Sequence, residues 1–198
     1  MPFNCVLIGR GPQFIACGDL LLNRGHRVNR VVSDCPQVTA WSQKHGISRL
    51  LPNEDLVGQL SREPFDFLFS IVNHAITPAE VLALPRLGAI NFHDSALPSY
   101  SGFNATSWAI LDKKEQHGVT WHRMTADVDG GAILVQKVFK ISDDDTAFSL
   151  AAKAADFAIK TFVELIQSLE SGSTIDSPAK TGQDFHYKSE RPGFPVLD

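Results

Sequence analysis

The chain has 198 residues, of which 43% are hydrophobic and 20% charged, and its formal net charge is −4. These values indicate one soluble globular domain, and an acidic balance without a Lys/Arg run argues against nucleic acid as a partner. No apolar stretch approaches the ~18 residues of a membrane span, and the N-terminus lacks a signal-peptide pattern. Three cysteines outside any ligand spacing predict a reducing, cytoplasmic location and no metal site.

Strands and helices alternate through the first half of the chain. Short apolar runs predict strands at 5–8, 26–32, 47–51, 65–72 and 89–92. Helical patterns between them predict helices at 14–22, 36–45, 53–60 and 78–84, the third capped by Asn53. This alternation predicts a Rossmann-like, doubly wound α/β fold with a mostly parallel sheet.

The second half of the chain changes character. A helix is expected at 104–111, strands at 118–124 and 133–141, and a long helix at 146–169 with acidic residues before it. The two strands are expected to pair antiparallel at one edge of the sheet. From 171 the composition turns to Ser, Gly and Pro, so we expect a catalytic domain at 1–170 and a C-terminal extension or linker at 171–198.

Asn91 and His93 form the most informative pair in the chain. Two residues apart in an extended segment, they point to the same side of the expected strand. They lie at its carboxyl end, where open α/β sheets bind their ligands. Asp129, in the loop between the two later strands, can join them. An amide donor, an imidazole and a carboxylate together suit acyl transfer.

The turn at Gly9-Arg10-Gly11 follows the first strand and opens the first helix. It matches a dinucleotide-binding fingerprint only in part, because Phe14 stands where a third glycine belongs. A tight turn, or a helix N-terminus that holds an anionic group of a substrate, are the other interpretations. His122 is expected in a strand near the site, without a carboxylate partner in its local sequence.

Three segments together resemble a known family: 85–102 with its Asn-Phe-His and Ser-Ala-Leu-Pro motifs, 118–122, and 129–136. They are similar to the 10-formyltetrahydrofolate-dependent formyltransferases, and the resemblance spans about residues 3–170. It implies the formyltransferase fold and transfer of a formyl group from 10-formyltetrahydrofolate, a co-substrate, to a primary amine. No metal is implied.

The resemblance also implies roles for individual residues. Asn91, His93 and Asp129 match the catalytic positions of the family. Donor-binding positions fall on Ala75, Ile76, Thr77, Leu97, Asp127, Val128, Gly130 and Gly131. We expect the acceptor at Gly9, Arg10, Gly11, Asn73, His74 and Ser95. Ala96 replaces the leucine that is usual in the family, Thr77 stands where an apolar residue is commoner, and Asn73-His74 replace a more usual aromatic-glycine pair.

The resemblance leaves the acceptor open. The segment 32–41 is short and lacks the basic insertion of the tRNA-acting members, which argues against tRNA. The sequence of these segments is most similar to that of formylation domains at the start of peptide and polyketide synthetases. This implies an aminoacyl group on a carrier protein, or another small amine, as acceptor, and other synthetase domains as partners. The alternatives are a 10-formyltetrahydrofolate hydrolase and a non-catalytic folate-binding module of an assembly line.

Overall fold

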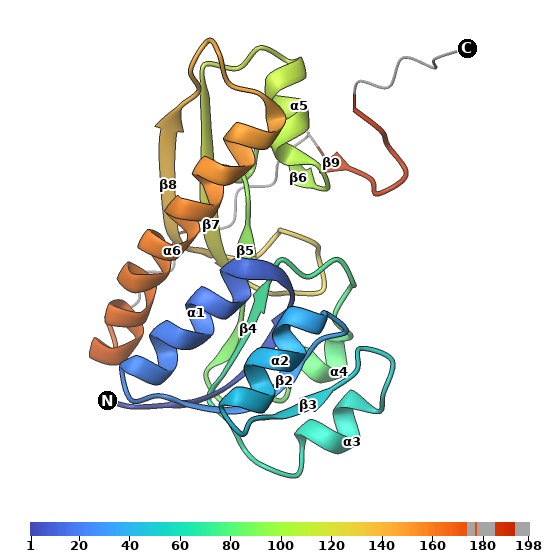
Figure 1. Ribbon diagram of the computed structural model, residues 1–198, viewed down its shortest axis with the longest axis vertical. Helices are drawn as coiled ribbons and strands as arrows, with labels where there is room; N and C mark the ends of the chain where they lie inside the picture. Colours follow the sequence, from blue (N-terminus) through green and yellow to red (C-terminus); the bar gives the residue numbers. More distant parts are fainter. Residues whose placement is uncertain (174–176, 178–184, 193–198) are drawn as a thin grey trace.

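A seven-stranded sheet forms the centre of the computed structural model, which describes residues 1–173, 177 and 185–192 (Figure 1). The strands lie in the order β3-β2-β1-β4-β5-β7-β8. Strands β1 to β5 run parallel, whereas β7 is antiparallel to β5 and β8 is antiparallel to β7. This arrangement confirms the predicted fold class. The strands are β1 (Asn4–Gly9), β2 (Arg27–Val32), β3 (Ser48–Leu50), β4 (Phe67–Ile71), β5 (Gly88–His93), β7 (Gln116–Arg123) and β8 (Ile133–Lys140).

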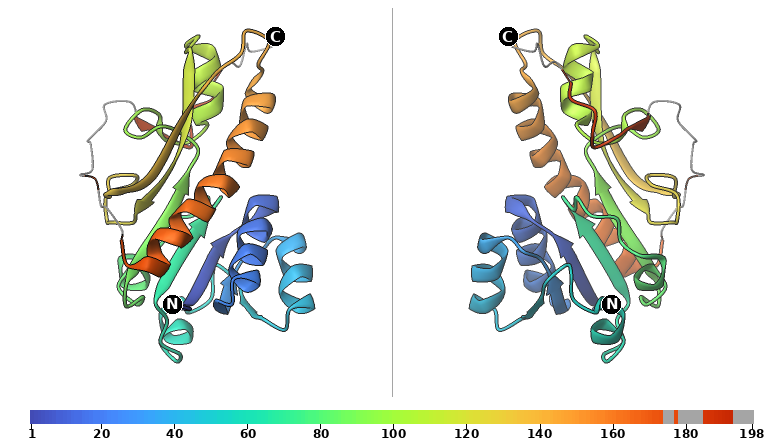
Figure 2. Two further views of the ribbon diagram at one scale, coloured as in Figure 1. Left: turned by 90° about the vertical axis from the view of Figure 1, so that its left-hand side faces the viewer. Right: turned by 90° about the vertical axis from the view of Figure 1, so that its right-hand side faces the viewer.

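Helices cover both faces of the sheet. The first face carries α1 (Gly11–Asn23), α2 (Pro36–Lys44) and α6 (Ala147–Ser171). Figure 2 shows α6 running along the sheet beside α1. The second face carries the short helices α3 (Leu56–Leu60) and α4 (Ala79–Leu82). A further helix, α5 (Ala105–Leu111), packs on the start of α6 in a small third cluster.

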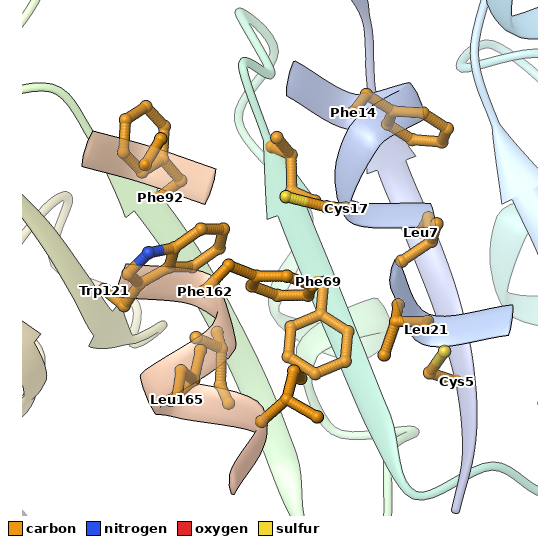
Figure 3. Packing of buried hydrophobic residues seen from close by; sticks show 14 of the residues in the cluster. Cys5, Leu7, Phe14, Cys17, Leu21, Phe69, Phe92, Trp121, Phe162 and Leu165 are labelled. Atoms are coloured by element: carbon orange, nitrogen blue, oxygen red, sulfur yellow. The ribbon is translucent and has the colours of Figure 1, made fainter. Parts of the chain in front are cut away.

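Aromatic packing on the α6 face joins the parallel and antiparallel parts of the sheet (Figure 3). Phe162 of α6 lies 4.8 Å from Trp121 of β7 and 5.4 Å from Phe69 of β4, measured between ring centroids. The buried indole N–H of Trp121 donates to Thr161 Oγ1 at 3.0 Å. Each such ring removes a large apolar area from water. The antiparallel edge, which carries part of the site, is therefore fixed to the parallel core.

Two helix starts differ from the sequence-based expectation. Helix α1 begins at Gly11, because Pro12 occupies its first turn, where a missing N–H costs nothing. Helix α3 begins at Leu56 and its cap is Asp55, so the prediction that Asn53 caps it was wrong. The Asp55 carboxylate accepts the N–H of Gly58 at 2.9 Å, which is the contact an N-cap requires.

A second, two-stranded sheet was not predicted. Strand β6 (Ser101–Gly102) pairs in parallel with β9 (Phe185–His186). Two residues are too few to leave a periodic pattern in the sequence. The described segment 185–192 belongs to the expected extension at 171–198. The β6–β9 pairing places this segment against the loop that follows β5.

Gly9 allows the end of β1 to lie directly against β4. Its φ is +140°, and a Cβ atom there would lie 1.8 Å from the carbonyl oxygen of Ile71. Only glycine tolerates both the torsion and the close approach. The carboxyl ends of β1, β4 and β5 therefore lie side by side and form one edge for a ligand.

Within the described ranges, no helix has both the length and the apolarity to cross a membrane.

Candidate active site

His93 lies at the end of β5 and is held by the backbone of the next loop. Its Nε2 lies 2.8 Å from the carbonyl oxygen of Tyr100. A carbonyl only accepts, so Nε2 carries a proton. The other ring nitrogen, Nδ1, lies 3.5 Å from Asp129 Oδ2. Nδ1 is therefore the ring nitrogen that can serve a substrate, and it faces a carboxylate.

Asp129 reaches this position because the β7–β8 loop turns sharply at the residue itself. Its φ of +54° is a left-handed conformation that aspartate tolerates better than most residues. The backbone N–H of Gly102 donates to its Oδ2 at 2.8 Å. Burial raises the pKa of Asp129, but neighbouring groups, among them His93 and the Gly102 N–H, hold it below the ordinary value. The carboxylate is thus buried and ionised at neutral pH.

His122 is the residue that the sequence analysis passed over. It lies directly opposite Asn91 in the antiparallel β5–β7 register, and its side chain is buried. Its Nε2 lies 3.1 Å from Asn91 Nδ2 and 3.4 Å from Asp129 Oδ1. Its carboxylate partner comes from outside its local sequence, because the loop after β7 doubles back. Two sequence signals mark this residue: it ends the motif segment 118–122, and it alternates with Thr120 along β7.

Glycine keeps the loop that carries Asp129 close to β7. A Cβ atom on Gly131 would lie 1.8 Å from the carbonyl oxygen of Arg123, so only glycine fits. The N–H of Gly130 donates to the carbonyl oxygen of Asp127 at 3.2 Å. Asp127 and Val128, two of the expected donor-binding residues, stand exposed on this loop.

Ser95 and Leu97 are buried in a hydrogen-bond network of the β5–β6 loop. The Ser95 hydroxyl donates to Ser99 O at 2.6 Å, and the Thr120 hydroxyl donates to Ser95 O at 2.6 Å. Leu97 donates its N–H to Thr120 Oγ1 and accepts from Gln136 Nε2. Both residues were expected to bind ligand. In this structure they fix the path of the loop that holds His93.

The loop after β4 lines a cavity of about 300 Å³. Its expected donor-binding residues Ala75, Ile76 and Thr77 lie on the wall together with Asn73. The remaining wall is mainly apolar and comes from β1, β2, the loop before α3, α3 itself, and α4 with the residue before it: Ile8, Val32, Pro52, Glu54, Asp55, Leu56, Val57, Pro78 and Val81. Leu97 and the Asp129 loop are not part of this wall, so the structure does not bring all three expected donor segments to one cavity.

The glycine turn after β1 forms a polar corner at the same edge. Arg10 Nη2 donates to Asp34 Oδ1 at 2.6 Å, and this pair is about half exposed. The guanidinium therefore stays near the start of α1, where a substrate anion would find both a cation and backbone N–H groups. Partial burial lowers the pKa of His74, and the positive charges of Arg10 and Lys188 lower it further. His74 is therefore neutral at pH 7.

The described part of the chain holds no group of three or more His, Cys, Asp or Glu side chains suited to a metal ion. One amide, two imidazoles and one carboxylate make up the cluster of Asn91, His93, His122 and Asp129. This cluster can donate hydrogen bonds to a developing oxyanion and can accept a proton.

Comparison with known proteins agrees with this chemistry. The formyl transferase family profile matches residues 26–166. A GDP-perosamine N-formyltransferase of Brucella melitensis is 33% identical over 133 residues, which cover 67% of this chain and 51% of that protein. A methionyl-tRNA formyltransferase of Synechococcus is 31% identical over 172 residues, covering 79% of this chain and 53% of that protein. The chain thus spans about half the length of these curated relatives.

Solved structures show the same fold at low sequence identity. A sugar 3N-formyl transferase determined in the presence of dTDP and 5-N-formyl-THF superposes with a TM-score of 0.80 at 20% identity, over 95% of this chain and 70% of that one. A phosphoribosylglycinamide formyltransferase from Anaplasma phagocytophilum superposes with a TM-score of 0.79 at 21% identity, over 96% of this chain and 100% of that one.

Proposed function

Since the chain belongs to the formyl transferase family, we propose that it transfers the formyl group of 10-formyltetrahydrofolate to the amine of a small acceptor. The observation that carries the proposal is the cluster of Asn91, His93 and Asp129 at the carboxyl end of β5. These are the three residue types that the reaction requires, and they converge from segments far apart in the sequence.

Asn91 and His93 stabilise the negative charge that develops on the formyl oxygen during attack. One N–H of the Asn91 amide faces His122, and its second N–H is available to donate. His93 Nε2 is held by Tyr100 O, so Nδ1 is the ring atom that His93 offers, as an N–H donor when the ring carries a second proton. Both donors are fixed before the reaction, which is how an oxyanion site lowers a barrier.

Asp129 takes up the proton that the attacking amine must lose. Its ionised carboxylate lies 3.5 Å from His93 Nδ1, so both groups face the same reacting atoms. Asp129 then returns a proton to the folate nitrogen that leaves, directly or through water. The charge balance of the site is restored, and no covalent bond to the protein is needed.

The cavity beside the β4–α4 loop supports a donor site at Ala75, Ile76 and Thr77. Its wall is mainly apolar, which suits a flat heteroaromatic ring. We assign further donor contacts to Asp127, Val128, Gly130 and Gly131 because their loop carries Asp129.

For the acceptor, we propose a small amine that carries an anionic group, with that group at Gly9, Arg10 and Gly11. Amino sugars linked to a nucleotide and aminoacyl groups on a carrier protein both fit this description, as does a phosphorylated amine. The relatives named above act on a nucleotide sugar and on methionyl-tRNA. We further propose Asn73 and His74 as acceptor contacts, and a cytoplasmic reaction.

One experiment tests the proposal directly. The protein is incubated with 10-formyltetrahydrofolate and panels of amino sugars, aminoacyl carrier proteins, phosphorylated amines and free amino acids. The expected result is an acceptor heavier by one carbonyl group, with tetrahydrofolate formed in equal amount. Formate release at the same rate with and without every acceptor would identify a hydrolase instead. Folate binding without turnover would identify a binding module.

A further inference from the structure

His122 stands at the centre of the cluster, yet it belongs to none of the three motif positions. Its Nδ1 lies 2.8 Å from the carbonyl oxygen of Arg123. Its Nε2 contacts Asn91 Nδ2 at 3.1 Å and Asp129 Oδ1 at 3.4 Å. With the side chain 3% exposed, these three protein atoms are its polar surroundings.

These three atoms are hydrogen-bond donors or acceptors of known type, so they determine which nitrogen of the His122 ring carries the proton. The carbonyl of Arg123 only accepts, so Nδ1 carries a proton. The Asn91 amide nitrogen only donates, so Nε2 meets it with a lone pair. A carboxylate only accepts, so Asp129 would need a proton on Nε2. The contact with Asn91 is the shorter and the one of hydrogen-bond length.

The strand pairing around His122 is irregular at this residue. The β7–β8 register shifts between Trp121 and His122, so that Trp121 faces Val135 and His122 faces Ile133. Bulges of this kind re-aim a side chain and gather next to active sites. The extra residue lies on β8, so β7 itself continues unbroken through His122, and the β5–β7 register keeps His122 opposite Asn91.

From these contacts we infer that His122 is a positioning residue for Asn91. As the neutral ring with its proton on Nδ1, it accepts one N–H of the Asn91 amide and thereby fixes which end of the amide is nitrogen. The second N–H then points toward the substrate. Without His122 the amide turns freely, and its oxygen faces the developing oxyanion for part of the time. The inference rests on the proposed function.

Variants at position 122 separate positioning from simple packing. His122→Gln keeps an acceptor near Nε2, whereas His122→Phe keeps a ring and removes the acceptor. We expect His122→Phe to lower kcat about tenfold, the effect of one lost buried hydrogen bond, with the donor KM unchanged. His122→Gln should recover most of that loss. The matched control is His117→Phe, a buried histidine on the opposite face of β7, which should leave kcat unchanged.

A double-mutant cycle with Asn91→Ala gives the decisive comparison. If His122 acts through Asn91, His122→Phe costs nothing further in the Asn91→Ala background. Multiplicative losses in the double variant, or a His122→Gln variant as impaired as His122→Phe, would overturn the inference.

A readout without turnover keeps the inference separate from the proposed function. NMR of the protein with ¹⁵N-labelled histidine at neutral pH should show His122 protonated on Nδ1 and bare on Nε2, and Asn91→Ala should shift the Nε2 signal. A proton on Nε2 contradicts the inference even if formyl transfer is observed. The expected tautomer without any formyl transfer refutes the proposed function and leaves the hydrogen bond in place.

Discussion

Gly102 and Asp129, 27 positions apart, are joined by a backbone hydrogen bond of 2.8 Å from the Gly102 N–H to Oδ2. Gly102 belongs to β6, and β6 pairs with β9 near the end of the described chain. The same loop supplies Tyr100 O, which holds His93. The loop at 100–103 therefore anchors both the imidazole and the carboxylate, and β9 supports that loop from outside.

His186 of β9 should therefore affect turnover without touching the cluster. Its ring stacks on Trp108 with 4.2 Å between centroids, and its carbonyl accepts the N–H of Phe103. His186→Ala should lower the free energy of unfolding by about 1 kcal/mol through lost stacking and reduce kcat several-fold. Urea unfolding and steady-state kinetics measure both. Tyr187→Ala, on the exposed neighbour, is the control; equal effects in the two variants would contradict a specific role of His186.

His93→Ala should lower formyl transfer by at least about 100-fold, the low end of the range for general acid–base groups. The variant loses the ring nitrogen Nδ1 that faces Asp129 and keeps the strand, because His93 is the last residue of β5. Initial rates with saturating donor and acceptor give the comparison, and thermal unfolding confirms that the variant is folded. A rate near that of the parent protein would remove His93 from the mechanism.

Asp129→Asn should impair turnover much more than donor binding. The amide oxygen still accepts the Gly102 N–H, so the loop keeps its path, but the side chain no longer takes up a proton. We expect kcat to fall by about 100-fold or more, while the dissociation constant of 10-formyltetrahydrofolate changes little. Calorimetry and single-turnover rates separate these effects. Weak donor binding with normal single-turnover rates would make Asp129 a binding residue.

Arg10→Ala should raise the acceptor KM about tenfold, as loss of a charge-assisted contact does, and leave the donor KM unchanged. Arg10 stays near the start of α1 through Asp34. Asp34→Asn is the matched variant, because it removes the ion pair and keeps the cation; its acceptor KM should stay near the parent value. An acceptor KM that is unchanged in Arg10→Ala would place the anionic group elsewhere.

Asp145 should make stability depend on pH in the acid range. Its carboxylate accepts from Lys153, from the Ser142 N–H and from the Ser149 hydroxyl, and these bonds lower its pKa to about 2. Because the pKa of this carboxyl is lower in the folded chain than in the unfolded chain, its ionisation stabilises the fold at pH values above the unfolded pKa of about 3.9. That stabilisation is lost as the pH falls toward 2. Asp145→Asn should be less stable than the parent at pH 7, and urea unfolding should show the difference shrinking below pH 4.

Much of the layout followed from local sequence patterns. The alternation of apolar runs with helical patterns indicated the parallel sheet, because each element must bury one face and the connections are short. The period of two along a strand put Asn91 and His93 on one side. Thr146 starts the long helix through a capping box with Ser149, close to the predicted position.

The arrangement of partners around Asn91 was decided only by the tertiary structure. His122 lies 31 positions from Asn91, and its place opposite that residue depends on the β5–β7 register. Asp129 turns inward because it adopts a positive φ and accepts from Gly102. A local pattern determines which face of a strand a residue occupies, whereas register and loop path depend on the packing of the whole chain. The sequence therefore determined the residue types at the carboxyl edge, and the fold decided which of their nitrogen and oxygen atoms meet.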